Sequence, residues 1–209
     1  MMKYKRRQVA GVCGILGVIV FLSFVGLAIF YSPGNFSVTQ NWISDLGGMG
    51  YAAFLNVSRP LVASSTTELL FDSGFAVAGI LGIIFSLGLL SDAHSPAYRL
   101  GAVCMLVGAA AFVGVGLLPE PLGVIHIVLS FALGIFIAAA MFLIGGSLVD
   151  SSAKLLGGFS IALGIVAVAG TSQISYGRGV AESILAAATV LWFVVFSIRM
   201  LRRTSLSET

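Results

Sequence analysis

Charged residues are scarce in this 209-residue chain. They make up 9% of the sequence, whereas hydrophobic residues make up 58% and the mean hydropathy is +1.08. A water-soluble globule of this size would have to expose large apolar patches to accommodate such a composition. The composition therefore excludes a soluble globular protein, and we expect membrane lipids to cover the surface and to be partners of the chain.

Histidine and cysteine are also scarce, with two of each. A structural zinc site needs four Cys or His ligands and a catalytic one usually needs three protein ligands, but the candidate residues described below include one histidine, His126. The sequence therefore predicts no zinc or haem centre, leaves open a metal held mainly by carboxylates, and identifies no cofactor. Cys13 and Cys104 lie inside apolar runs, which favours packing roles over a disulfide.

Long apolar runs make up most of the sequence. A membrane-spanning helix needs roughly 20 mainly apolar residues, and the sequence predicts an all-α bundle of six such helices in a single domain, 1–209. The predicted spans are 9–31, 69–91, 100–118, 122–149, 155–172 and 180–200. A competing interpretation makes 38–62 a further span, but it places Asp45 and Arg59 inside the bilayer, and we disfavour it.

Basic residues are distributed unevenly between the two sides of this six-span arrangement. Arg59 and Arg178 fall on one side, and the other nine fall on the opposite side: Lys3, Lys5, Arg6, Arg7, Arg99, Lys154, Arg199, Arg202 and Arg203. Because positively charged segments resist translocation, we expect a multi-pass protein of the cell membrane with both termini in the cytoplasm. Basic residues beside apolar runs indicate anchoring at the membrane surface and not a nucleic-acid partner.

Residues 32–68 form a long external loop between the first two predicted spans. Loops of this length are uncommon unless they are functional or disordered, and the aromatic and aliphatic residues here argue against disorder. We expect the loop to lie on the outer membrane face or to dip into it. Asn35 and Asn56 each begin a match to the glycosylation sequon, a pattern short enough to occur by chance.

Polar residues gather on the external side. Glu68 follows Ser65 at the capping-box spacing, so we expect the second span to begin near Thr66, with Asp72 more than one turn inside it. Pro121 suits a first helical position, which would place His126 more than one turn into the fourth span. The residues of the opposite short loops are expected only to contact water: Asp92, His94, Arg99, Asp150 and Lys154.

Ionisable side chains below the membrane interface are costly and usually mark functional sites. The candidate catalytic residues are Ser44, Asp45, Asp72 and His126, with Asp45 orienting His126 as a general acid or base. The candidate substrate-binding residues are Asn41, Glu120, Arg178 and Glu182, with Arg178 holding a phosphate group.

Structural alternatives remain for several of these residues. Glu68 needs only its capping role, and Arg178 and Glu182 at i,i+4 spacing need only form an ion pair. Asp72 is also consistent with solvation at the headgroup level, and His126 with a hydrogen bond to a neighbouring helix.

Three segments resemble a family of small prokaryotic membrane proteins, domain of unknown function 998, which is distantly similar in layout to eukaryotic Frag1-type proteins. They are Ile43-Ser44-Asp45-Leu46-Gly47, Phe71-Asp72-Ser73-Gly74, and Gly116-Leu117-Leu118-Pro119-Glu120 followed by His126. The family pattern has Asn where this chain has Asp72, and it has a shorter segment before the second span. The resemblance implies about six spans and an external group of Ser44, Asp45, Glu120 and His126.

Three classes of function fit the sequence. The first is a protein that binds or modifies a lipid headgroup, including a membrane-embedded hydrolase or transferase, and the likeness to Frag1-type proteins favours lipid by analogy. The second is a transporter or channel for ions or small solutes. The third is a non-catalytic subunit that binds a membrane protein partner. Small residues at Ala78, Gly82, Ser160 and Gly164 suit close helix packing, within one chain or in a homo-oligomer.

Overall fold

The computed structural model describes residues 2–32, 36–48, 64–171 and 177–205. Six helices within these residues are long and apolar enough to cross a membrane, which confirms the predicted all-α bundle. The long helices are α1 (Met2–Tyr31), α2 (Ser65–Ser91), α3 (Pro96–Leu117), α4 (Val124–Val149), α5 (Lys154–Thr171) and α6 (Arg178–Ser205). Two short 3-10 helices, η1 (Ile43–Gly47) and η2 (Glu120–Leu122), lie between them.

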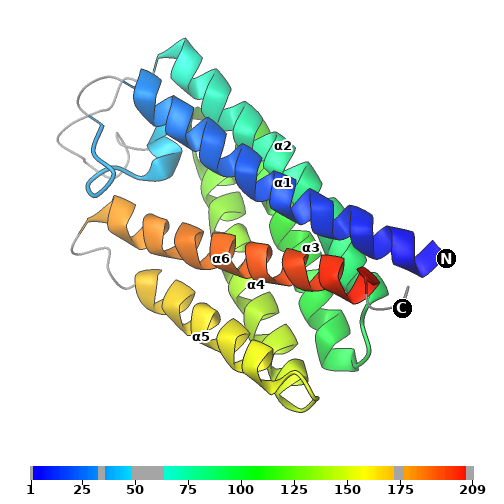
Figure 1. Cartoon of the computed structure of the whole chain (residues 1–209). Coiled ribbons are helices and arrows are strands. Elements are labelled where there is room, and N and C mark those ends of the chain that lie inside the picture. Colours follow the sequence, from blue (N-terminus) through cyan, green and yellow to red (C-terminus); the bar gives the residue numbers. More distant parts are fainter. Residues whose placement is uncertain (1, 33–35, 49–63, 172–176, 206–209) are drawn as a thin grey trace.

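The six long helices pack side by side in chain order, and the first also packs against the last (Figure 1). An even number of crossings brings both termini to the same end of the bundle, which we call the terminal end. The opposite end carries η1 and η2, and we call it the loop end (Figure 1). Loop residues 33–35 and 49–63, with Asn35 and Asn56, lie outside the described part of the chain.

Two helix starts differ from the sequence prediction. Helix α2 begins at Ser65 because the Ser64 hydroxyl accepts a hydrogen bond from the Thr67 backbone N–H at 3.2 Å, one residue before the expected cap. Helix α4 begins at Val124 and not at Pro121, because Gly123, with φ of +64°, interrupts the helical path after η2. His126 therefore lies in the first turn of α4.

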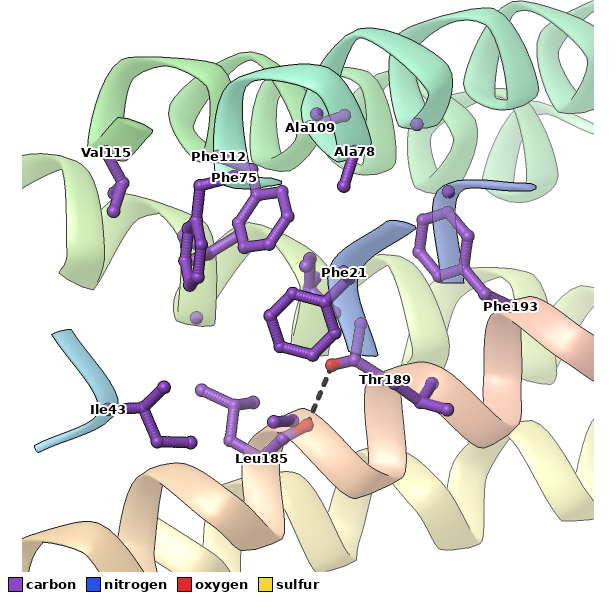
Figure 2. Close-up of a pocket in the computed structure, with 18 of the residues that line it drawn as sticks. Phe21, Ile43, Phe75, Ala78, Ala109, Phe112, Val115, Leu185, Thr189 and Phe193 are labelled. Atoms are coloured by element: carbon purple, nitrogen blue, oxygen red, sulfur yellow. Dashed lines mark hydrogen bonds between the residues drawn. The ribbon is translucent and has the colours of Figure 1, made fainter. Parts of the chain in front are cut away.

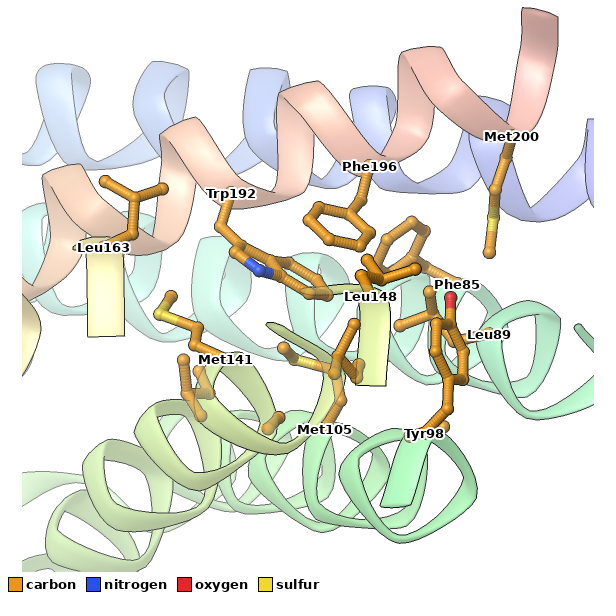
Figure 3. Packing of buried hydrophobic residues seen from close by; sticks show 14 of the residues in the cluster. Phe85, Leu89, Tyr98, Met105, Met141, Leu148, Leu163, Trp192, Phe196 and Met200 are labelled. Carbon is orange, nitrogen blue, oxygen red and sulfur yellow. The ribbon is translucent and has the colours of Figure 1, made fainter. Parts of the chain in front are cut away.

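The main hydrophobic core fills the terminal half of the bundle (Figure 3). Trp192 stacks on Phe196 with ring centroids 4.0 Å apart, and its indole N–H donates to the Ser160 hydroxyl at 2.7 Å. Ser160 in turn donates to the Met141 carbonyl at 2.8 Å. This relay joins α6, α5 and α4 and satisfies the buried indole N–H of Trp192 and the hydroxyl of Ser160.

At the terminal end an ion pair joins α1 to the end of α2. Arg7 donates to the carboxylate of Asp92, and the two side chains are 23% and 9% exposed. The expectation that Asp92 would contact only water is therefore wrong. The short loop itself gives no sign of this ion pair, because the arginine lies on the neighbouring helix α1.

A second apolar cluster lies toward the loop end, where η1 packs onto α1, α2 and α3. It contains Ile43 and Leu46 of η1 together with Phe71, Phe75 and Val115. Leu46 is fully buried, so η1 is anchored to the bundle by its own side chains. The described part of the long loop packs on the helix bundle, and its position on or in the outer membrane face stays a prediction.

Candidate functional site

Asp45 in η1 first serves the local backbone. Its Oδ2 accepts hydrogen bonds from the Trp42 backbone N–H at 3.0 Å and from the Asn41 side-chain amide at 3.2 Å. Capping the free N–H groups at the start of a helix in this way stabilises the turn. The Asn41 side chain also accepts from the Ser37 N–H at 2.9 Å, so both residues organise the segment that leads into η1.

Glu182 reaches η1 from helix α6. Its carboxylate accepts hydrogen bonds from the backbone N–H groups of Ile43 and Ser44. The approach is close because Gly179 is the second residue of α6: a Cβ there would lie 2.1 Å from the Val38 carbonyl oxygen. Glu182 thus ties the segment before α2 to the start of α6.

Glu120 in η2 completes a group of three carboxyls, Asp45, Glu120 and Glu182, which we call the carboxyl cluster. The Glu120 side chain is hydrogen-bonded to Asp45 and is only 5% exposed. Burial raises the pKa of Glu120 from its ordinary 4.5 to about 8, with repulsion by Asp45 and then Glu182 adding to the rise. At neutral pH Glu120 is therefore mostly a neutral acid, able to donate to the Asp45 carboxylate.

One oxygen of Glu120 is left over. Its Oε2 is buried and has no hydrogen-bond partner among the described residues. A buried polar atom without a partner costs free energy, so such an atom in a folded protein calls for an explanation. The carboxyl cluster therefore contains three acidic groups and at least one buried acceptor oxygen without a hydrogen-bond partner among the described residues.

His126 is 3% exposed, and its Nδ1 lies 2.9 Å from the Leu118 carbonyl oxygen. Because a carbonyl only accepts, Nδ1 carries the proton and Nε2 is the free acceptor. Nε2 has no partner among the described residues, so the expected hydrogen bond from His126 to Asp45 is not formed. The Leu118 carbonyl, at the end of α3, orients the ring.

Asp72 and Ser44 lie at the same end of the bundle. Asp72 Oδ1 is buried without a partner among the described residues, and a Cβ at Gly47 would lie 2.9 Å from it. Asp72 therefore faces the end of η1 and lies two turns into α2. The side chain of Arg178 lies outside the described part of the structure, so its roles toward phosphate and toward Glu182 stay predictions.

An apolar cavity of about 140 Å³ lies between the helices at the loop end. Helices α1, α2, α3, α4 and α6 form its walls, with the rings of Phe21, Phe75, Phe112 and Phe193 facing into it (Figure 2). Ser44 and Glu182 belong to the same lining, so the cavity extends to the cluster.

Two hydroxyl groups in this lining are already bonded within their own helices. Thr189 donates to the Leu185 carbonyl at 2.8 Å (Figure 2), and Ser130 donates to the His126 carbonyl at 2.9 Å. The remaining walls are apolar, and the polar groups with bonding capacity lie at the end formed by Ser44 and Glu182. A molecule that fits this space has one apolar part and one polar end.

A comparison with protein-family models matches the chain to the family described as protein of unknown function (DUF998) over residues 15–199. The chain belongs to this family. The match confirms the resemblance seen in the sequence. No match was found among curated proteins or among solved structures. The DUF998 chain is thus a multi-pass membrane protein whose site has to be interpreted from its own geometry.

Sequence reasoning placed Asp45, Glu120 and Glu182 at one end of this DUF998 chain but missed the cavity. The signal that was present is the set of small residues in its lining: Gly17, Ala78, Gly79, Gly82, Ala109 and Gly134. Most small residues in spans serve close helix packing, as at Gly116, where a Cβ would lie 2.5 Å from the Asp72 carbonyl oxygen. The sequence does not distinguish small residues that allow close helix packing from those that line a cavity, because the difference depends on how the helices pack.

Proposed function

We propose that this protein binds an amphiphilic lipid, with part of the hydrocarbon in the cavity and the polar end at the carboxyl cluster. The observation that carries the proposal is the shared lining: apolar residues and Glu182 line the same cavity. Ligand sites are typically apolar pockets with a few convergent polar groups that fix orientation. This arrangement has that character inside a bundle that lipid surrounds.

The size of the cavity defines what it would hold. An engineered apolar cavity of about 150 Å³ stays dry and binds benzene, so about 140 Å³ accommodates on the order of six carbon atoms. The cavity therefore suits the segment of a hydrocarbon chain nearest the polar group and not a whole lipid tail. The rest of the tail would lie along the lipid-facing surface of the helices.

We also propose that the terminal end faces the cytoplasm and that the carboxyl cluster serves the outer leaflet of the cell membrane. Support comes from the charges: Arg7, Arg99, Lys154 and Arg202 all lie at the terminal end of their helices. Retention of Lys and Arg on the cytoplasmic side is the strongest general determinant of orientation. Labelling of single cysteines introduced at Ser95 and Leu122 by an impermeant thiol reagent in intact cells, in a Cys13 and Cys104 double-serine background, tests it. Labelling at Leu122 alone is the expected result.

The binding proposal is tested by filling the cavity. Gly134 of α4 lines it, and a Cβ there would lie 3.5 Å from the nearest side-chain atom, Leu185 Cδ2, which is ordinary contact. Gly134→Leu should therefore fold and occupy the space that a ligand would use. Gly146→Leu on the same helix is the matched control, because nothing lies within 4 Å of a Cβ at that position.

The measurement is the lipid retained by each purified protein, detected by native mass spectrometry. We expect the wild-type chain and Gly146→Leu to retain lipid in equal amounts, and Gly134→Leu to retain at least about tenfold less, a loss of roughly 1.4 kcal/mol. Equal retention by Gly134→Leu and the wild type would overturn the proposal. Thermal unfolding of all three proteins separates loss of ligand from loss of fold.

A further inference from the structure

We propose that the polar end of the bound lipid carries a primary ammonium group, which donates hydrogen bonds to Glu120 and Glu182. This inference rests on the proposed function and deepens it by naming the head group. Its basis is the kind of atom that the loop end leaves without a partner. Among the described residues these atoms include three acceptors, Glu120 Oε2, Asp72 Oδ1 and His126 Nε2, and one hydroxyl, Ser183 Oγ, which can both donate and accept.

Acceptors call for a ligand that donates. A carboxylate has about four lone-pair positions, so Glu182 retains capacity after accepting from the N–H groups of Ile43 and Ser44. Glu120 Oε2 is buried within the cluster and lies within electrostatic reach of Glu182. A primary ammonium supplies three N–H donors and one positive charge, which matches both the free acceptors and the acidity.

Other head groups fit less well. A quaternary ammonium carries the charge but has no N–H to donate. A neutral polyol donates hydrogen bonds but does not offset the repulsion between carboxylates that are held together. A metal ion is disfavoured by the geometry, since no group of three His, Cys, Asp or Glu among the described residues is arranged to hold one. The ammonium group satisfies both needs.

The location of Glu182 connects the head group to the cavity. Glu182 is one of the residues that line the cavity, and its carboxylate accepts hydrogen bonds from η1 at the same end. An amine bound there would lie at the polar end of the apolar space. Neutralisation of the cluster would also favour the ionised form of Glu120, so binding should release a proton.

The test compares three lipids with identical acyl chains, added to the purified chain in lipid nanodiscs made from a neutral synthetic matrix. Phosphatidylethanolamine offers a primary ammonium, phosphatidylcholine a quaternary one, and phosphatidylglycerol hydroxyl groups with no cation. We expect phosphatidylethanolamine to bind at least about tenfold more tightly than either of the others. Glu120→Gln and Glu182→Gln should each remove most of this preference, and Glu68→Gln should leave it intact.

Each outcome distinguishes the two proposals. Binding of all three lipids with equal affinity, lost in Gly134→Leu, would overturn the ammonium inference and leave the lipid site standing. No binding of any lipid would overturn both. If Glu182→Gln unfolds because Glu182 caps η1, the test depends on Glu120→Gln. The ammonium inference requires that Glu120→Gln stays folded, binds phosphatidylcholine with the wild-type affinity and loses the preference for phosphatidylethanolamine.

Discussion

At the terminal end of the bundle the Trp192 indole donates a hydrogen bond to Ser160, and Ser160 donates one to the Met141 carbonyl. Both bonds lie within a tightly packed hydrophobic core. At the loop end Glu120, Asp72 and His126 keep acceptor atoms with no described partner, and a cavity lies between the helices. Folding alone accounts for the Trp192 relay, although Ser197 Oγ is also buried in this half without a partner among the described residues. The arrangement at the loop end leaves both polar and apolar groups for another molecule to satisfy.

The loop end is nevertheless held in place. Glu182 fixes η1 through two backbone N–H groups, and Leu46 is fully buried beneath it. The groups without hydrogen-bond partners are therefore held in fixed positions before a ligand binds. Such preorganisation allows selective binding, because little conformational entropy is lost when the ligand binds. The difference between the two ends separates the part of the fold that supplies stability from the part that supplies a site.

The largest difference between the two ends should appear in the free energy of unfolding when one side chain at each end is truncated to alanine. Trp192 is fully buried in the packed core, so Trp192→Ala should lower the free energy of unfolding by about 3–5 kcal/mol. Leu185 lines a space that is already open, so Leu185→Ala loses fewer contacts and should cost about 2 kcal/mol. Unfolding in mixed detergent micelles measures both.

A control separates shape from hydrogen bonding in that comparison. Trp192→Phe keeps an aromatic ring against Phe196 but removes the indole N–H that Ser160 accepts, so its cost should fall well below that of Trp192→Ala. Equal costs for Trp192→Ala and Leu185→Ala would show that the two ends do not differ in packing.

The second prediction concerns the pH dependence of stability. The pKa of Glu120 in the folded chain is about 8, above its ordinary 4.5, so between these values the folded state binds more protons than the unfolded state. The contribution of Glu120 to stability is therefore lost as pH rises from about 4.5 to 8. The carboxylates that face it are those of Asp45 and Glu182, with His126 on the adjoining helix α4.

Glu120→Gln should remove this dependence, because the amide is neutral at every pH. We expect its melting temperature at pH 8 to exceed that of the wild type by on the order of 5 °C, with a much smaller difference at pH 5. Glu68→Gln is the control carboxyl at the same end. Parallel pH profiles for the wild type and Glu120→Gln would show that Glu120 ionises normally in the folded chain.

The fold was predictable to a large degree because spans are set by composition. Each predicted span overlaps one of the six observed helices, since no backbone other than a helix satisfies its hydrogen bonds within a short apolar stretch. The boundaries were less predictable. Single residues decided them: the Ser64 cap at α2 and the positive φ of Gly123 before α4.

The site was predictable only in part. Spans of even number place Asp45, Glu120 and Glu182 at one end, and the structure brings them into one cluster. For His126 the sequence offered a hydrogen bond to a neighbouring helix as one alternative, and its Nδ1 lies against the Leu118 carbonyl at the end of α3; which carbonyl it meets depends on the shifted start of α4. The cavity depends on how small and aromatic side chains from five helices fit together, which no local pattern encodes.

The smallest effect in this comparison is expected from the charges at the two ends. Arg7 and Asp92 form a partly exposed ion pair, so a double-mutant cycle with Arg7→Ala and Asp92→Ala should give a coupling energy of about 1 kcal/mol. Raising the salt concentration to 1 M shortens the screening length to about 3 Å and should remove much of this coupling.

A second cycle, Asp45→Asn with Glu120→Gln, probes the loop end in the same way. At pH 6 Glu120 is a neutral acid hydrogen-bonded to Asp45, so this pair has no opposite charge to screen, and its coupling should change little with salt. Repeating the cycle above pH 8 should reverse its sign, because two ionised carboxylates repel each other. A salt-sensitive, favourable coupling for Asp45 and Glu120 at pH 6 would mean that the two ends hold their charges in the same way, and the contrast between them would fail.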